Sequence, residues 1–515
     1  MSITRRTALQ WLATAPALSL VRTASTAQQS GPANPEHYLP QWTSLMQHGC
    51  PDWFRDAKFG IYFTWGAYSV PAFANEWYPH FMYLPGRQEY EHQVATYGPL
   101  DKFGYKDFIS GFTAQHFNAD AWVGLFKDAG ARYMGPICEH ADGFSLWDSR
   151  VNQWNAARMG PRRDIVGEME RAVRKQGLKF LTTFHHQWLW GWYTSPDLKA
   201  DIYNPAFADL YWPHKYTLGT PVPEEWCPSD IAGAFNYDHP DPAPSARFCE
   251  IWRDKVIEVV DRYQPDALYF DSRTFIIPET YRMEMLAHFY NSAHSAGREA
   301  VMTFKEKDFA VGSGLLDIEA GQLGEKTNFV WQTDDKVEWN SWSYVTDPDY
   351  KTAGRLIRQL IDIVSKNGNL LLNVGPRADG TIPAEVESRL RQIGAWLRVN
   401  GEAIYETRPA DRFGEGPTRI KAGSFGSDRK LDFTAQDIRF TTRARAFYIH
   451  VLGAPGKEVR IASLNRDTPL PGGTLHSVEL LGSSGLLRWE WTPDGLAIQI
   501  PETRPSDDAV VIKLT

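Results

Sequence analysis

The chain has 515 residues, which is too long for one small domain and indicates a large domain with at least one smaller one. Its formal net charge is -8 and it has no basic block, so a nucleic-acid-binding surface is not expected. Aromatic residues make up 13% of the chain and include 20 Trp, a composition that favours contact with carbohydrate.

Residues 1–27 have the pattern of an export signal. Arg5 and Arg6 precede an apolar stretch at residues 8–21, and small residues follow at 24–27. The paired arginines favour the twin-arginine route of a bacterium, and an ordinary signal peptide is the alternative. No later apolar run is long enough to span a bilayer, so we expect a periplasmic or secreted protein without membrane contact after export.

Residues 35–405 form the predicted catalytic domain, and from about residue 58 apolar strand-like runs alternate in it with segments of helical period. Predicted strands cover residues 58–65, 133–138, 179–185, 267–271, 300–304, 329–332 and 369–374. Predicted helices cover residues 119–129, 164–176, 248–263, 281–295, 350–366 and 384–400, and Gly177 and Gly368 are each expected to end a helix. This rhythm, with about eight strands, predicts a (β/α)8 TIM-like barrel. The alternative, an open doubly wound sheet, usually carries a glycine-rich phosphate loop that is not found here.

The pattern changes in residues 406–515. Short alternating segments at 446–451, 459–461 and 510–514 are separated by turn sequences at 471–473 and 482–485. These segments predict a C-terminal antiparallel β-sandwich. A Pro-rich insertion at residues 195–245 is expected to lie over the active-site face of the barrel.

Two stretches carry most of the chemical information. Asp271 ends the strand-like run at 267–271, and Glu76 is followed by Trp77 and Tyr78. Catalytic residues of α/β barrels lie at the carboxyl ends of strands, although an Asp there can also simply cap a turn. Because aromatic faces stack on sugar rings and carboxylates break glycosidic bonds, the combination indicates a sugar site.

Cleavage of a glycosidic bond needs a second carboxyl group with a different pKa. The residues alone leave four candidates open: Glu306, Glu319, Glu325 and Glu338.

The histidines and cysteines indicate no metal site, because none stand at metal-ligand spacing. His140 follows the second predicted strand, and His185 and His186 end the third. Neighbours on a strand point to opposite faces, so one of the pair can face the pocket while the other packs. Cys227 and Cys249 could form a disulfide, and Cys138 is expected to be a buried thiol.

An ordered series of motifs spans most of residues 40–405. The motifs are residues 58–71 with 76–78, 140–147, 154–155, 159–161, 265–272, 331–334 and 365–383. As a series they resemble the family 29 glycoside hydrolases, the retaining α-L-fucosidases. The resemblance implies an exo-acting enzyme that needs no cofactor and takes a fucosylated oligosaccharide as substrate.

The resemblance also implies roles for single residues. Asp271 falls on the catalytic nucleophile, and residues 317–319 resemble a segment that would make Glu319 the acid/base. The predicted substrate-binding residues are Glu76, Trp77, Trp65, His140, His185, His186, Tyr269, Lys305 and Trp331.

Two positions depart from the family pattern. Thr64 and Ala141 stand where the family usually has histidines that bind fucose hydroxyls, a loss for which His185 or His186 could compensate. The departures keep two alternatives open. One is a related glycosidase for α-L-galactosides, which differ from fucosides only at C6, and the other is a non-catalytic glycan-binding protein.

Overall fold

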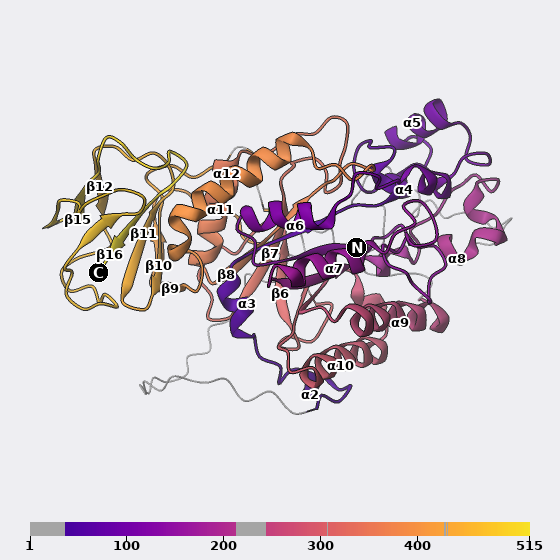
Figure 1. Ribbon diagram of the computed structural model, residues 1–515, viewed down its shortest axis with the longest axis horizontal. Coiled ribbons are helices and arrows are strands. Elements are labelled where there is room, and N and C mark those ends of the chain that lie inside the picture. The colour runs from indigo at the N-terminus through magenta and orange to yellow at the C-terminus, as the bar shows by residue number, and fades with distance from the viewer. Residues whose placement is uncertain (1–36, 213–243, 306, 427–428, 430) are drawn as a thin grey trace, which may run out of the picture.

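The computed structural model describes residues 37–212, 244–305, 307–426, 429 and 431–515. Its larger part is a closed barrel of parallel strands in the order β1 to β8, the predicted class of fold (Figure 1). The last strand pairs with the first, with Gly60 opposite Leu371, and so closes the cylinder. The strands are β1 (Phe59–Phe63), β2 (Tyr133–Glu139), β3 (Lys179–Phe184), β4 (Ala267–Phe270), β5 (Val301–Lys305), β6 (Leu315–Glu319), β7 (Trp331–Lys336) and β8 (Gly368–Val374).

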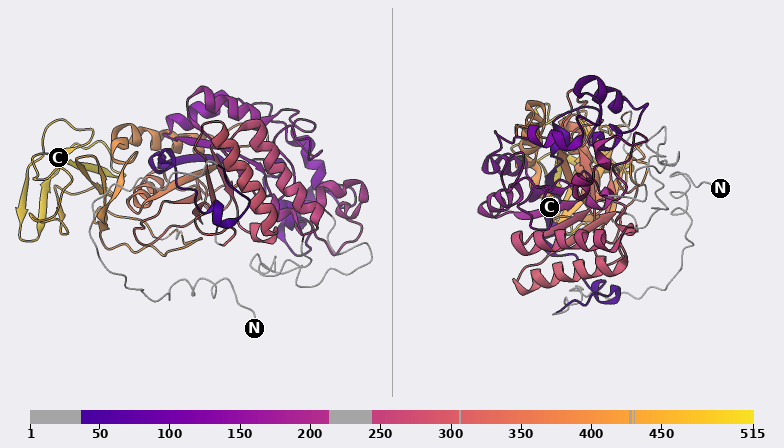
Figure 2. Two further views of the ribbon diagram at one scale, coloured as in Figure 1. Left: turned by 90° about the horizontal axis from the view of Figure 1, so that it is seen from below. Right: turned by 90° about the vertical axis from the view of Figure 1, so that its right-hand side faces the viewer.

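Helices pack around this barrel and at one of its ends (Figures 1 and 2). They are α2 (Trp42–Leu45), α3 (Asp52–Ala57), α4 (Tyr78–Phe81), α5 (Gln88–Tyr97), α6 (Ala119–Asp128), α7 (Ile165–Lys175), α8 (Ala208–Tyr211), α9 (Ala246–Tyr263), α10 (Glu279–Ser295), α11 (Ala353–Ser365) and α12 (Ala384–Asn400). Short 3-10 turns are η2 (Ala67–Ser69), η3 (Tyr105–Gly111), η4 (His186–Leu189), η5 (Asp201–Tyr203), η6 (Pro205–Phe207), η9 (Thr274–Ile276) and η10 (Gly401–Ala403). None of the described helices is long and apolar enough to cross a membrane.

Local sequence signals begin and end these helices. At the start of α7, the Asp164 carboxylate accepts the N–H of Gly167 at 3.0 Å, which satisfies a donor that the helix leaves unpaired. Gly177 follows the same helix with a φ of +69°, as predicted for a residue that ends it.

The prediction that Gly368 ends α11 is wrong. Asn367 takes the left-handed conformation after that helix, with a φ of +75°. Gly368 instead opens β8, where a Cβ would lie 2.7 Å from the ring of Trp331. The glycine therefore serves close packing between β8 and β7.

The sequence prediction also differs from the structure at β6 and β7. It had no strand at Leu315–Glu319 and placed the next one at residues 329–332, whereas β7 covers Trp331–Lys336. The adjacent Asp334 and Asp335 look like loop residues in the sequence. Both can be buried in this strand because each has a buried cationic partner, Lys305 for Asp334 and Lys351 for Asp335.

Two antiparallel sheets follow the barrel. Their strands are β9 (Arg408–Glu415), β10 (Ile438–Arg443), β11 (Ala446–Val451), β12 (Glu458–Ile461), β13 (Val478–Leu480), β14 (Trp489–Thr492), β15 (Gly495–Gln499) and β16 (Val510–Leu514). One sheet has the order β13-β16-β11-β10-β9 and the other β12-β15-β14. Both contribute to one core, Ile438 and Ile449 from the first and Val459 and Ile498 from the second, so they form the predicted sandwich. The sandwich lies at one end of the molecule (Figure 2).

The connections after β1 and β3 gather at the other end. Helices α4 and α5 come from the first connection and α8 from the second, and Figure 1 shows them together, away from the sandwich. Asp201 of the predicted insertion accepts hydrogen bonds from Tyr83, at 2.8 Å, and from Tyr211, at 2.5 Å. Residues 213–243 of that insertion, including Cys227, and residues 1–27 lie outside the described residues. Cys138 is buried in β2, as predicted, and Cys249 is buried in α9.

Candidate active site

Four ionisable side chains come from consecutive barrel strands. Asp271 directly follows β4, Lys305 ends β5, Glu319 ends β6, and Asp334 lies in β7. In a parallel barrel the carboxyl ends of the strands meet at one face, so these side chains converge there although they are far apart in the sequence.

Lys305 is the centre of this group. Its Nζ lies 3.0 Å from Asp271 Oδ1, 3.0 Å from Glu319 Oε2 and 3.4 Å from Asp334 Oδ1. The lysine side chain is only 3% exposed, whereas those of Asp271 and Glu319 are 14% and 17% exposed. The two partly exposed carboxyl groups therefore face solvent at the carboxyl ends of the strands. The buried lysine lies deeper in the barrel and contacts both of them.

The surroundings separate the pKa values of these two carboxyl groups. Burial raises the pKa of Asp271, but the charge of Lys305 outweighs burial and lowers it to about 2. Burial raises the pKa of Glu319 to about 7, because the attraction of Lys305 is opposed by repulsion from Asp271 and Asp334. At neutral pH Asp271 is ionised and about half of the Glu319 groups carry a proton, so the two groups can take the separate roles that acid/base chemistry needs.

Two further carboxylates lie beneath the pair, and sequence reasoning had not selected either. Asp334 accepts hydrogen bonds from the hydroxyls of Tyr62, at 2.8 Å, and Tyr269, at 3.0 Å. Burial and the charge of Asp334 hold the pKa of Asp317 well above its usual range. The raised pKa favours the neutral form of Asp317, which limits the negative charge buried around Lys305.

Trp188 positions the Asp271 carboxylate, although it was not among the predicted substrate-binding residues. Its indole N–H donates to Asp271 Oδ2 at 2.8 Å. The side-chain amide of Gln187 donates to the Asp271 carbonyl oxygen at 2.7 Å. Both residues lie in the 3-10 turn η4 directly after β3, and this position at a strand end was the available signal.

The histidines divide into two groups. His140 and His185 stack with ring centroids 5.0 Å apart. Burial holds the pKa of His140 well below its usual range and lowers that of His185 to about 4, so both rings are neutral at pH 7. His186 turns the other way, stacking on Trp252 and donating from Nε2 to the Trp252 carbonyl oxygen at 3.1 Å.

Glu76 and Trp77 form another wall. Glu76 Oε2 accepts the N–H of Trp342 at 2.9 Å, and the ring of Trp342 lies 5.9 Å from Lys305 Nζ. Trp77 packs edge-on against Trp188, the residue that holds Asp271, at 5.5 Å between ring centroids. Aromatic rings therefore surround the two carboxyl groups.

A family model described as alpha-L-fucosidase matches residues 25–402. The chain belongs to the α-L-fucosidase family of glycoside hydrolases. The plasma alpha-L-fucosidase of Rattus norvegicus is 32% identical over 480 residues, which cover 90% of each chain. The tissue alpha-L-fucosidase of Homo sapiens is 29% identical over 494 residues, covering 93% of this chain and 92% of that one.

Solved structures agree with this family. The crystal structure of Thermotoga maritima alpha-fucosidase in complex with fucose has a TM-score of 0.72 and 27% sequence identity to this chain. The match covers 93% of this chain and all of the other. The likeness therefore includes the barrel and the sandwich together.

The two departures from the family pattern have structural roles in this member. The Thr64 hydroxyl donates to Asn373 Oδ1 at 2.7 Å, which joins β8 to the residue after β1. Ala141 is buried beside His140. The ring of His185 stacks on that of His140, and compensation by His185 stays a prediction.

Trp65, Trp331 and His186 were predicted to bind substrate, but the structure does not bring them to Lys305. Trp65 is buried among aromatic side chains and donates to the Arg377 carbonyl oxygen at 2.7 Å. Trp331 is fully buried at the start of β7, the end of the strand opposite to the carboxyl groups. His186, as described above, packs on α9. In the structure all three side chains make packing contacts, so we leave them out of the candidate site.

The other candidates for the second carboxyl group are Glu306, Glu325 and Glu338. Glu306 is outside the described residues, and Glu325 is exposed in the connection that leads into β7. Glu338 is buried, and burial followed by the charge of Glu76 raises its pKa to about 8. Among the described residues, no group of three His, Cys, Asp or Glu side chains could hold a metal ion.

Proposed function

We propose that the protein is an exo-acting, retaining α-L-fucosidase that releases terminal L-fucose from oligosaccharides or glycoconjugates. The observation that carries the proposal is the pair Asp271 and Glu319, bridged by Lys305 at 3.0 Å on each side. Membership of the α-L-fucosidase family indicates that the sugar released is L-fucose.

The separation of the two carboxyl groups supports retention of configuration. Because one oxygen of each lies 3.0 Å from the same nitrogen, these oxygens are separated by no more than twice that distance. Retaining glycosidases place the two groups about 5–5.5 Å apart, whereas inverting enzymes need roughly 6.5–9.5 Å to admit a water molecule. The site is therefore suited to direct attack by Asp271 on the sugar.

In the first step the ionised Asp271 attacks the anomeric carbon of fucose. A covalent bond forms between carboxylate oxygen and carbon as the glycosidic bond breaks. Glu319 gives its proton to the leaving oxygen, so the aglycone departs as a neutral alcohol. The low pKa of Asp271 and the raised pKa of Glu319 provide these protonation states near neutral pH.

In the second step Glu319, now ionised, takes a proton from a water molecule. The oxygen of that water attacks the anomeric carbon and releases Asp271. Two displacements return fucose with its original configuration. Lys305 stays protonated throughout, because the surrounding carboxylates outweigh burial and hold its pKa well above its usual range. Its positive charge therefore stabilises Asp271 or Glu319, whichever of the two is ionised in a given step.

The neutral polar side chains around the pair are suited to binding sugar hydroxyls. His140 and His185 each offer one donor and one acceptor nitrogen when uncharged. The carboxylate of Glu76 accepts hydrogen bonds, and Trp77 offers an apolar face. We assign these four residues to the glycone site, together with Lys305 and Tyr269 beneath it.

The test is hydrolysis of an aryl α-L-fucoside, with the product followed by NMR. The wild-type protein should release the α-anomer first, and Asp271→Asn should abolish turnover. Glu319→Gln should slow a fucosylated disaccharide far more than an aryl fucoside, whose leaving group needs little protonation. Glu325→Gln is the matched control and should leave both rates unchanged.

Other results would redirect the assignment. Release of the β-anomer first would contradict retention. Turnover of α-L-galactosides without α-L-fucosides would favour the related glycosidase, and binding of L-fucose without any turnover would favour a glycan-binding protein.

We also propose that the chain is exported with loss of residues 1–27, leaving a catalytic domain at 35–405 and a sandwich domain at 406–515. The twin arginine and the following apolar stretch support export. N-terminal sequencing of the protein from the native cell envelope tests the cleavage site. Replacing Arg5 and Arg6 with Lys should trap the precursor in the cytoplasm if the twin-arginine route is used.

A further inference from the structure

The connection between β9 and β10 leaves the sandwich and reaches the carboxyl end of β6. The N–H of Phe425 donates to the carbonyl oxygen of Glu319 at 2.6 Å, and the N–H of Glu319 donates to Ser424 Oγ at 3.2 Å. The N–H of Gly423 donates to the Gln322 carbonyl oxygen at 3.0 Å. Residues 423–425 therefore bind both the N–H and the carbonyl oxygen of Glu319, the proposed acid/base.

Two backbone features show that this contact is closely fitted. A Cβ at Gly321 would lie 2.1 Å from the carbonyl oxygen of Gly423, so only glycine allows this approach. Phe425 has a φ of +56°, in the left-handed region that L side chains rarely adopt. Such conformations persist where the surroundings fix them, and they cluster at functional sites.

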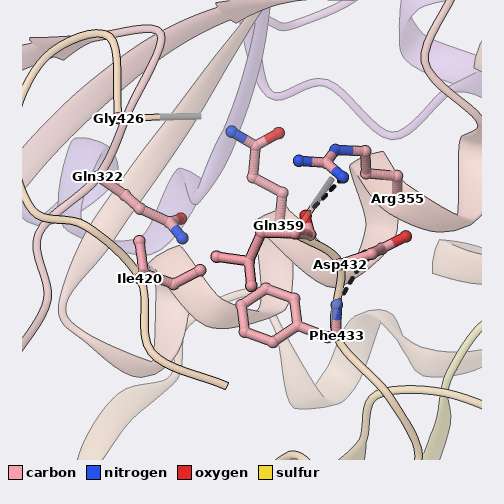
Figure 3. A pocket seen from close by; sticks show the side chains of 8 residues that line it. Gln322, Arg355, Gln359, Ile420, Gly426, Asp432 and Phe433 are labelled. Carbon is pink, nitrogen blue, oxygen red and sulfur yellow. Dashed lines mark hydrogen bonds between the residues drawn. The ribbon is translucent and has the colours of Figure 1, made fainter. Parts of the chain in front are cut away.

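Helix α11 anchors the rest of the connection. Arg355 Nη1 donates to the Leu431 carbonyl oxygen at 2.7 Å, and Arg358 forms an ion pair with Asp432 at 2.7 Å. A cavity of about 30 Å³ remains between α11 and the connection (Figure 3). Gln322 from the barrel faces Ile420 of the connection across it. That volume is enough for one or two water molecules, so the connection lies firmly on the barrel.

Phe425 is the exposed aromatic residue of this contact. Its side chain is 52% exposed although it is large and apolar. Its backbone N–H contacts the backbone of Glu319, the group that would protonate the leaving oxygen, so residues 423–425 border the side of the site from which the leaving group departs. An aromatic ring there offers a face for the C–H surface of a sugar or for an aryl ring.

We propose that residues 423–425 of the sandwich domain form the leaving-group subsite, with Phe425 as its aromatic surface. The ligand class is a six-membered ring attached to fucose, either a pyranose or an aryl group. This inference rests on the proposed α-L-fucosidase activity and adds to it a contribution of the C-terminal domain to substrate choice.

The test compares fucosides that differ only in the leaving group. α-L-Fucosyl fluoride has no ring in its leaving group, a dinitrophenyl fucoside has a ring but needs no proton, and a fucosylated disaccharide needs both. Phe425→Ala removes the ring, and Phe425→Gly also relieves the positive φ. Phe329→Ala is the matched control, because Phe329 is 49% exposed but precedes β7 at the opposite end of the barrel.

Both Phe425 variants should lower kcat/KM about tenfold for the dinitrophenyl fucoside and the disaccharide, the usual effect of losing one apolar pocket contact. The fluoride rate and the inhibition constant of free L-fucose should not change, and Phe329→Ala should change none of these values.

Three outcomes would overturn the inference. Equal rates for wild type and variants on all three substrates would exclude contact with the leaving group. Loss on the disaccharide alone would show that Phe425 only helps Glu319 to donate its proton, and equal loss on all three would show a purely structural role. Failure of the proposed function is recognised separately, because wild type itself would then cleave no α-L-fucoside.

Discussion

Replacing Lys305 with Met removes the charge that separates the pKa values of Asp271 and Glu319 while keeping a side chain of similar length. Hydrolysis requires Asp271 ionised and Glu319 protonated, so kcat/KM should fall below the pKa of the first and above that of the second. In the wild type these pKa values are about 2 and about 7. The variant tests whether Lys305 sets both.

The structure gives the size of the change. Lys305 lowers the pKa of Asp271 from 3.8 to about 2 although burial acts in the opposite direction. Loss of the lysine should therefore raise this pKa by about two units or more, which is roughly 2–3 kcal/mol. The pKa of Glu319 should rise as well, because an attractive charge at 3.0 Å is lost. Both limbs of the pH profile should move to higher pH.

The assay is kcat/KM against pH for a fucosylated disaccharide, whose leaving group needs the proton of Glu319. The wild-type rate should stay flat down to about pH 4, while the Lys305→Met rate should already be falling there. Lys351→Met is the matched control. Lys351 is as buried as Lys305 and pairs with Asp335 at 2.6 Å, but it lies outside the carboxylate group.

Both variants should lose stability of about 3–5 kcal/mol, because each leaves a buried carboxylate without its cation. Only Lys305→Met should shift the limbs. Limbs that stay in place in Lys305→Met, or that move equally in Lys351→Met, would refute the argument that Lys305 sets the two pKa values.

Three further predictions follow from the same contacts. Asp334→Asn removes a repulsive charge from Glu319, so the alkaline limb should move to lower pH, opposite to the Lys305 variant; an unchanged limb would contradict this role. Trp188→Phe removes the donor 2.8 Å from Asp271 Oδ2 and should lower kcat/KM about tenfold or more, together with some loss of stability because Trp188 is buried. Because the folded pKa of Glu319 is raised from 4.5 to about 7, wild type should lose up to roughly 3 kcal/mol of stability relative to Glu319→Gln as pH rises through that window. Urea unfolding of both proteins at pH 5 and pH 8 measures that difference, and equal stability changes would argue against a raised pKa.

Local patterns in the sequence were sufficient for most of the elements. The predicted helix at 384–400 matches α12, and the predicted strand at 446–451 matches β11. These elements are encoded by the spacing of apolar residues and by residues that begin or end helices, all of which act over a few positions. The placement of Asp271 directly after a buried strand has the same local origin.

The composition of the candidate site was decided by the tertiary structure. Asp334 lies inside a strand, and its approach to Lys305 depends on how β5, β6 and β7 are arranged around the closed barrel. Trp331 was misplaced because β7 begins two residues later than predicted, so its ring lies at the opposite end of the barrel. The chain order contains neither fact, because both are set by contacts between segments distant in sequence.

The sequence by itself thus determined the kind of protein, with its strands and helices in order, the barrel and sandwich they imply, and the family motifs. The tertiary structure decided which side chains meet and what charge each carries. His185 and His186 are adjacent in the chain, yet one stacks on His140 and the other on Trp252. A pKa depends on burial and on distances of a few ångströms to other charges, and these distances exist only after the barrel has closed.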